Sequence, residues 1–118
     1  MIALALALII PTAPAQGEVG ETMSLMSRAI GECIRDNALR LEPSGEPAAT
    51  IADSAVTACG HHDEDALYVI AMWANIDRGL DAEGSVRVAR SGLASWKQGY
   101  REQAILSVTE ARAARAAR

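Results

Sequence analysis

The polar run His61-His62-Asp63-Glu64-Asp65 contains the residue types best suited to bind a metal. Imidazoles and carboxylates are ligands that Zn²⁺ and Cu²⁺ accept, so His61, His62, Asp63 and Asp65 are candidate metal ligands. The chain has no second histidine cluster to complete such a site. The same run also fits an exposed connection between two helices, in which the acids favour the positive end of the second helix. A metal-binding or pH-responsive role is therefore the alternative to a structural one.

Cys33 and Cys59 are the only cysteines, and their positions favour a disulfide between them. The turn-forming residues 42–47 separate two helix-like segments. Cys33 lies 12 residues before Gly45 and Cys59 lies 14 residues after it, so the two come level in an antiparallel helical hairpin. Free buried cysteines and a redox or metal site are the alternatives.

Charge is distributed unevenly along the chain. Residues 16–65 carry ten acids and three bases, whereas residues 66–118 carry five acids and eight bases, within a formal net charge of −4. Most of the bases fall on one side of a predicted C-terminal helix, and the candidate basic binding face consists of Arg90, Lys97, Arg101, Arg112 and Arg115. This face could bind an acidic protein or an anionic membrane surface. It could equally pair with the acidic half of the same molecule, or be a solvated charged face.

The composition excludes several other classes of function. The sequence has no nucleophile elbow and no glycine-rich phosphate loop, so no catalytic residue is proposed, no enzyme activity is expected and no cofactor is implied. Only four residues are aromatic and none is phenylalanine, and the overall charge is acidic, which argues against nucleic acid as a partner. Trp73 and Trp96 are expected to be core anchors.

The first two helices are predicted around the cysteines. Apolar residues recur at three- and four-residue steps over 21–41, which predicts the first helix. Pro47 suits the first turn of a second helix, with Ser44 or Glu46 as its cap, and Gly60 is expected to end it.

Two further helices are predicted after Gly60. The third covers 66–77, with Asp63 or Asp65 as its cap, and it is apolar nearly all round, so we expect it to be central and buried. Ser85 is expected to cap a long fourth segment, whose apolar stripe is predicted to stop near Tyr100. The predicted fold is therefore all-α: a small disulfide-stapled bundle of about four helices, with an antiparallel first hairpin and a long C-terminal helix ending in a basic tail.

The first fifteen residues are typical of a secretory signal peptide. Residues 2–10 are apolar but too short to span a membrane, and Ala13-Pro14-Ala15 has the small-x-small form of a cleavage site. We expect residues 1–15 to be removed and residues 16–118 to form a single helical domain, with a tail over 101–118 that protrudes or frays. A buried N-terminal helix is the alternative.

One resemblance supports this prediction. The stretch Glu32-Cys33-Ile34-Arg35, followed by Ser44-Gly45-Glu46-Pro47-Ala48 and then by Ala52 and Ala58-Cys59, resembles small exported helical proteins with one cysteine pair from high-GC Gram-negative bacteria. The resemblance implies a periplasmic helical protein with a disulfide and brings no activity with it.

Together these features predict a non-enzymatic exported protein, periplasmic or secreted, that acts by binding or scaffolding. The expected contact surface is the basic fourth segment, with Trp96 and Tyr100 at its edge. The alternative is a weak divalent-metal or pH-responsive module at residues 61–65.

Overall fold

The structure is a computed structural model that describes residues 17–118. About 90% of these residues are helical and none lies in a strand, which confirms the predicted all-α class for this part of the chain. The elements are α1 (Glu18–Leu41), η1 (Glu42–Ser44), α2 (Ala48–Ala58), η2 (Gly60–His62), α3 (Asp63–Arg78) and α4 (Ala82–Ala116).

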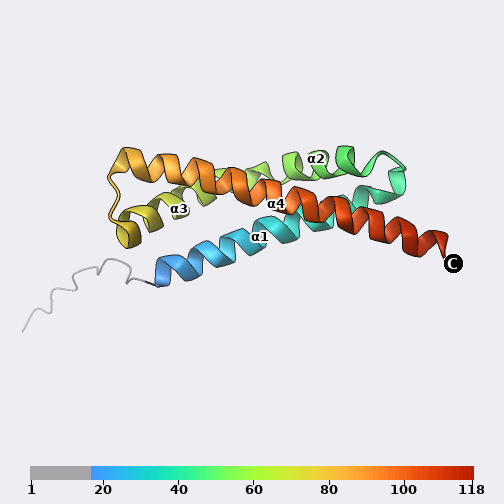
Figure 1. The fold of residues 1–118 in the computed structure, drawn as a ribbon, viewed down its shortest axis with the longest axis horizontal. Coiled ribbons are helices and arrows are strands. Elements are labelled where there is room, and N and C mark those ends of the chain that lie inside the picture. Colours follow the sequence, from blue (N-terminus) through green and yellow to red (C-terminus); the bar gives the residue numbers. More distant parts are fainter. Residues whose placement is uncertain (1–16) are drawn as a thin grey trace, which may run out of the picture.

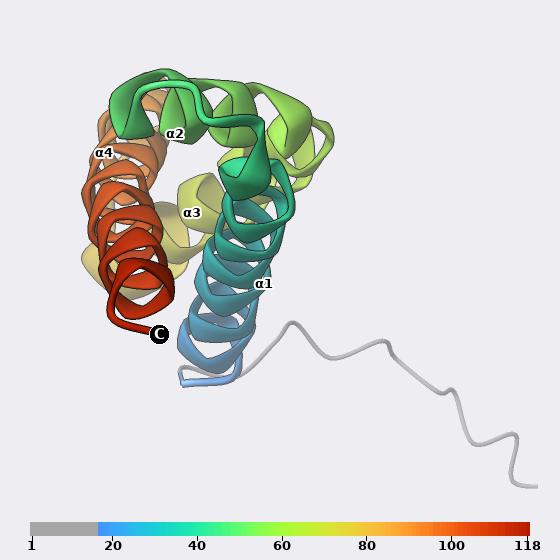
Figure 2. The same ribbon diagram turned by 90° about the vertical axis from the view of Figure 1, so that its right-hand side faces the viewer.

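The helices form three arms (Figure 1). Only Cys59 and the single 3₁₀ turn η2 separate α2 from α3, so the two helices make one bent arm beside α1 and α4. Seen along the bundle, α1, α4 and the α2–α3 arm occupy three sides (Figure 2). The expected bundle of about four helices is thus confirmed only in part, because two of its helices share one arm.

The core consists of branched residues separated by alanines. Ile30 and Ile34 of α1 and Ile51 of α2 are almost fully buried. Alanines at helix contact positions let the arms approach closely, since they add little volume. The buried alanines are Ala38, Ala52, Ala55, Ala66, Ala74, Ala89 and Ala104.

Three predicted helix starts were wrong in detail. The cap of α4 is Asp81, whose carboxylate accepts a hydrogen bond from the Gly84 amide at 2.7 Å, whereas Ser85 is buried in the first turn. α3 begins at Asp63, so this residue lies inside the first turn instead of capping it. Pro47 occupies the cap position of α2, and neither Ser44 nor Glu46 caps that helix.

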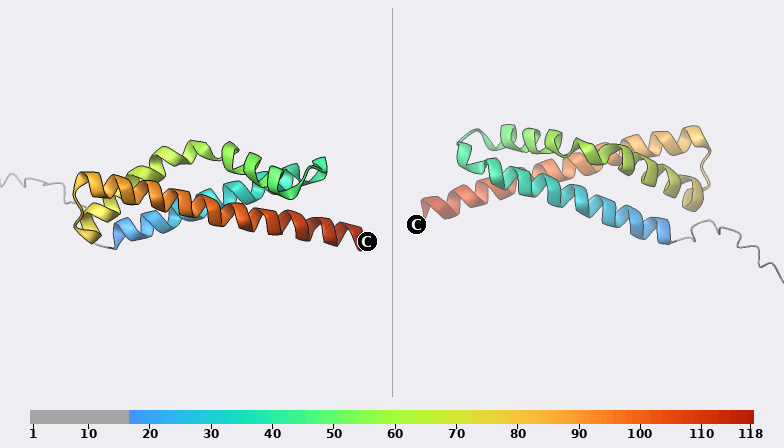
Figure 3. Two further views of the ribbon diagram at one scale, coloured as in Figure 1. Left: turned by 45° about the horizontal axis from the view of Figure 1, so that its top comes forward. Right: turned by 180° about the vertical axis from the view of Figure 1, so that it is seen from behind.

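The third helix is not central, contrary to the prediction. Only one side of α3 is buried, through Ala66, Val69, Ile70 and Ala74, whereas Tyr68 is 69% exposed. α3 forms an outer arm that packs mainly against α4 (Figure 3). Its nearly continuous apolar run reflects composition and does not indicate burial on all sides.

The packing stripe of α4 also extends further than predicted. It continues past Tyr100 through Ala104 and Val108, both almost fully buried. An alternation of three- and four-residue steps, extended past Tyr100, lands on the polar residues Gln103 and Ser107. Consecutive steps of four carry the stripe onto Ala104 and Val108 instead, and α4 stays helical to Ala116.

The predicted signal peptide, residues 1–15, lies outside the described residues. Within residues 17–118, no helix combines the length and the apolar character needed to cross a membrane.

Candidate functional site

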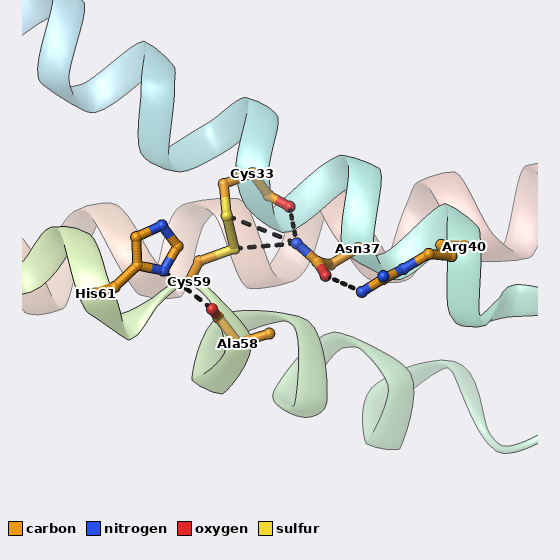
Figure 4. Close-up of a disulfide and its surroundings, with 6 residues drawn as sticks. All are labelled: Cys33, Asn37, Arg40, Ala58, Cys59 and His61. Carbon is orange, nitrogen blue, oxygen red and sulfur yellow. Dashed lines mark hydrogen bonds between the residues drawn. A yellow bond between two sulfur atoms is a disulfide. The ribbon is translucent and has the colours of Figure 1, made fainter.

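The predicted disulfide is present between α1 and the end of α2. Cys33 and Cys59 are bonded, with their Cα atoms 6.0 Å apart. The side-chain amide of Asn37 lies against the bond and donates to the Cys33 carbonyl at 2.8 Å, while the Arg40 guanidinium donates to the Asn37 carbonyl oxygen (Figure 4). The bond therefore links the two helices of the first hairpin.

The two histidines lie next to this disulfide, in η2. Their rings are in contact, with centroids 4.1 Å apart, and His61 Nδ1 lies 3.2 Å from the Ala58 carbonyl oxygen. The carboxylate of Asp63 is instead 2.6 Å from the ammonium of Lys97, and Asp65 is exposed. The histidines of the predicted metal-binding run are thus close to the cysteines, whereas Asp63 is held in an ion pair.

Four members of the predicted basic face contact acidic residues of the same chain. Lys97 pairs with Asp63, and Arg101 Nε lies 2.6 Å from Asp53 Oδ1. Arg112 and Arg115 both pair with Glu42. The fifth, Arg90, has no ion-pair partner within residues 17–118. For these four residues, the structure favours the internal pairing that the sequence left open.

Glu42 is the acid that organises the end of the molecule where η1 meets α4. It is only 6% exposed and lies between the guanidinium groups of Arg112 and Arg115. Arg112 also donates to the backbone carbonyls of Glu42 and Glu46. Nothing in the sequence distinguishes Glu42 from other acids, because its burial depends on how the C-terminal part of α4 crosses the turn.

The Asp53–Arg101 pair joins α2 to α4 at the surface. The hydrogen bond from Arg101 lowers the pKa of the Asp53 carboxyl, desolvation opposes this shift, and the positive charge of Arg101 adds to it. The same bond raises the pKa of Arg101. Since Asp53 remains mostly exposed, the pair contributes little to stability.

A cleft of about 540 Å³ lies between α1 and α4, and sequence reasoning did not predict it. We call it the α1–α4 cleft. Its lining residues are Met23, Ser24, Ser27, Arg28, Gly31, Glu32, Arg35, Trp96, Tyr100, Gln103, Ala104 and Ser107. The aromatic and thioether side chains supply apolar surface, and the hydroxyls, the amide and the charges supply polar surface.

Tyr100 fixes the geometry of the cleft. Its hydroxyl is 2.7 Å from the hydroxyl of Ser27, which ties α4 to α1. A Cβ atom on Gly31 would lie 2.4 Å from Cε1 of the Tyr100 ring, so only glycine allows the ring to approach α1 this closely. Gly31 was not singled out from the sequence, because its function depends on a ring 69 positions away.

Two arginines of α1, Arg28 and Arg35, line the cleft without a counter-ion. Both are exposed, and within residues 17–118 neither makes a hydrogen bond or an ion pair, even though Glu32 lies between them in the sequence. They are seven residues apart, nearly two whole turns, so they lie on the same side of α1. That spacing was the signal available in the sequence.

The two tryptophans have different environments, and neither is fully buried. Trp96 packs against the core and also lines the cleft. Trp73 is half-buried on α3, with the Arg78 guanidinium 5.4 Å from its ring centre in a cation–π contact. Only Trp96 is thus positioned to report on the cleft.

No protein-family model, curated protein or solved structure matches this chain.

Proposed function

We propose that this protein is a non-enzymatic binding protein whose α1–α4 cleft takes up a small amphipathic carboxylate. The proposal rests on one cleft that combines an aromatic surface with two arginines, Arg28 and Arg35, that have no ion-pair partner among residues 17–118. The sequence predicted a contact surface on the basic side chains of α4. The surface proposed here is instead the side of α4 that carries Trp96 and Tyr100.

The size and surface of the cleft suit a small ligand. Its volume of about 540 Å³ falls within the range of roughly 300–1,000 Å³ that is typical of small-molecule sites. Met23, Trp96 and Tyr100 offer apolar surface for a hydrocarbon or ring. Burial of this hydrocarbon or ring would stabilise the complex through the hydrophobic effect, which is non-directional.

The unpaired positive charges of Arg28 and Arg35, within the described residues, favour a ligand with an acidic group. Arg28 and Arg35 present guanidinium groups whose planar donor geometry matches a carboxylate. Lys97, Arg101, Arg112 and Arg115 have acidic partners already, so a ligand would have to displace those partners to bind there. Arg28 and Arg35 require no such displacement.

Titration with decanoate tests the proposal. Trp73→Phe leaves Trp96 as the only tryptophan, so its fluorescence reports on the cleft, and calorimetry on the wild-type protein measures the affinity independently. We expect saturable binding that Arg28→Ala with Arg35→Ala weakens about tenfold or more, since hydrogen bonds to charged groups contribute roughly 1.5–3 kcal/mol.

The matched control is Arg90→Ala with Arg118→Ala, which removes two arginines whose side chains also have no ion pair within the described residues but do not line the cleft. This variant should bind decanoate as the wild type does. An equal loss in both double variants would show that binding follows overall charge and would contradict the proposal, as would the absence of saturable binding.

We also propose that the protein is exported and works in an oxidising compartment, periplasmic or extracellular. The disulfide supports this, because such bonds persist where thiols are not kept reduced. Intact-mass measurement of protein from the native host, with and without reductant, tests it. Loss of residues 1–15 and a gain of two hydrogens on reduction are expected. A mass that retains those residues, or that shows two free thiols before reduction, would contradict export.

A further inference from the structure

The disulfide and η2 bring three potential metal ligands together, and the second cysteine of the bond adjoins this group. The Cys33 sulfur and one ring nitrogen each of His61 and His62 lie within 4.8 Å of one another. Cys59, which immediately precedes η2, contributes its sulfur through the bond to Cys33. Two cysteines and two histidines form one of the common ligand sets of structural Zn²⁺ sites, which are tetrahedral.

Sulfur binds Zn²⁺ as a thiolate, and in the disulfide both sulfurs are bonded to each other. We propose that reduction of the Cys33–Cys59 bond turns this cluster into a Zn²⁺ site formed by both thiolates and by the imidazoles of His61 and His62. The disulfide and the metal site are then mutually exclusive states of one cluster. This inference does not depend on the α1–α4 cleft.

The chemistry requires a two-electron reductant, such as a dithiol. A thiolate of the dithiol attacks the sulfur of Cys33, the less buried of the two residues, and the sulfur of Cys59 leaves as a thiolate. The second sulfur of the reductant then displaces the Cys33 sulfur. Overall, the protein gains two electrons and two protons, and the reductant becomes a disulfide. Zn²⁺ then replaces the two thiol protons, which pass to solvent.

The required movement is small. Two Zn–S bonds of about 2.3 Å at a tetrahedral angle place the sulfurs roughly 3.8 Å apart. The Cα atoms of Cys33 and Cys59 are 6.0 Å apart, so rotation of the two side chains is sufficient without separating the helices. Because the Ala58 oxygen can only accept, Nδ1 of His61 is the donor in their 3.2 Å contact, and its Nε2 keeps a lone pair for the metal (Figure 4).

A polar group that would support such a site already faces both sulfurs. The Asn37 amide nitrogen lies 3.6 Å from the Cys33 sulfur and 3.5 Å from the Cys59 sulfur. The Arg40 guanidinium holds Asn37 in place by donating a hydrogen bond to the side-chain carbonyl oxygen of Asn37 (Figure 4). Donors that orient the ligands are the usual surroundings of a protein metal site. Asp63, in contrast, is held by Lys97 and is not needed as a ligand.

The test is a titration of the full chain with Zn²⁺, and with Co²⁺ as a spectroscopic probe, in the oxidised form and after phosphine reduction. Reduced wild-type protein should give the absorption of tetrahedral Co²⁺ with thiolate charge transfer. It should also bind Zn²⁺ about a hundredfold more tightly, or more, than reduced His61→Ala with His62→Ala. The oxidised form should give no such spectrum.

Asp63→Asn with Asp65→Asn is the matched control and should keep the affinity of the reduced wild type. A loss that follows the aspartates and not the histidines would overturn the proposal, as would equal Zn²⁺ affinity in both redox states. If reduction unfolds the chain, Zn²⁺ must restore its helical circular dichroism in the wild type but not in the histidine variant. Failure to restore it would equally overturn the proposal.

Discussion

The two ends of the contact between α1 and α4 use arginine in opposite ways. Near the C-terminus of α4, Arg112 and Arg115 enclose the buried carboxylate of Glu42 and close the end of the bundle. Further along, in the α1–α4 cleft, Arg28 and Arg35 are exposed and form no ion pair with any residue that the structure describes. The first pair of arginines is committed to the fold, and the second pair is available to a ligand.

The difference teaches that a row of basic residues on a helix does not by itself identify a binding surface. The basic side chains of α4 were the conspicuous ones, yet Lys97, Arg101, Arg112 and Arg115 meet the acids of the first half of the chain. Arginines that have no ion-pair partner within residues 17–118, such as Arg28 and Arg35, are the better candidates for function.

The greatest loss of stability is expected from removing the disulfide, which joins α1 to the end of α2. Cys33→Ser with Cys59→Ser removes a bond that spans 26 residues, and the chain-entropy relation gives a loss of about 3.5 kcal/mol in the free energy of unfolding. Urea denaturation with a metal chelator present measures it. A loss below about 1 kcal/mol would mean that packing alone holds the first hairpin.

Glu42→Gln tests the ion pairs at the end of the molecule where η1 meets α4. The variant removes the charge that faces Arg112 and Arg115, which are partly exposed and can be rehydrated. We therefore expect a loss of about 1–2 kcal/mol, below the roughly 3–5 kcal/mol of a fully buried pair. Glu46→Gln is the control, because the Glu46 side chain is exposed and only its backbone accepts from Arg112. Equal losses in the two variants would show that Glu42 has no special function.

Gly31→Ala tests the cleft. The added Cβ would displace the Tyr100 ring, and we expect a loss of about 1–2 kcal/mol from overpacking. Gly20→Ala on the same helix is the control. Its Cβ meets nothing within 4 Å, so it should be neutral or stabilise the protein by up to about 1 kcal/mol. A neutral Gly31→Ala would mean that the ring does not pack against α1 in solution.

The smallest effect concerns the pH dependence of the Asp53–Arg101 pair. Arg101 lowers the pKa of Asp53 in the folded state, so folding favours the ionised carboxylate. The contribution to stability is thus fully present above the pKa of the unfolded chain, near 3.8. It is lost as the pH falls through the lower folded value.

Denaturation of the wild type and of Asp53→Asn between pH 7 and pH 2 checks this dependence. The two stabilities should differ slightly at neutral pH and converge in acid. Asp36→Asn, which alters an exposed acid of α1 that has no ion pair among the described residues, is the control. A difference that grows as the pH falls would contradict the sign of the pKa shift.

The sequence predicted the features that depend on helix geometry close to a turn, such as the disulfide. Cys33 and Cys59 lie nearly symmetrically about the turn at 42–47, so helical geometry alone brings them together. The one-sided burial of α3 could not be predicted, because a run of apolar residues does not say how many neighbours surround a helix. The environment of Glu42 and the packing of Gly31 against Tyr100 both depend on the path of α4, which brings together residues about 70 positions apart. Those contacts define the site.

Side-chain NMR can show whether the arginines of the cleft and the arginines paired with acids differ in their availability to a ligand. Decanoate is added to ¹⁵N-labelled protein while the Nε–Hε resonances of all arginines are followed. We expect saturable shifts at Arg28 and Arg35, with Arg101, Arg112 and Arg115 unchanged. Shifts confined to the arginines of α4, or equal shifts at every arginine, would contradict this expectation.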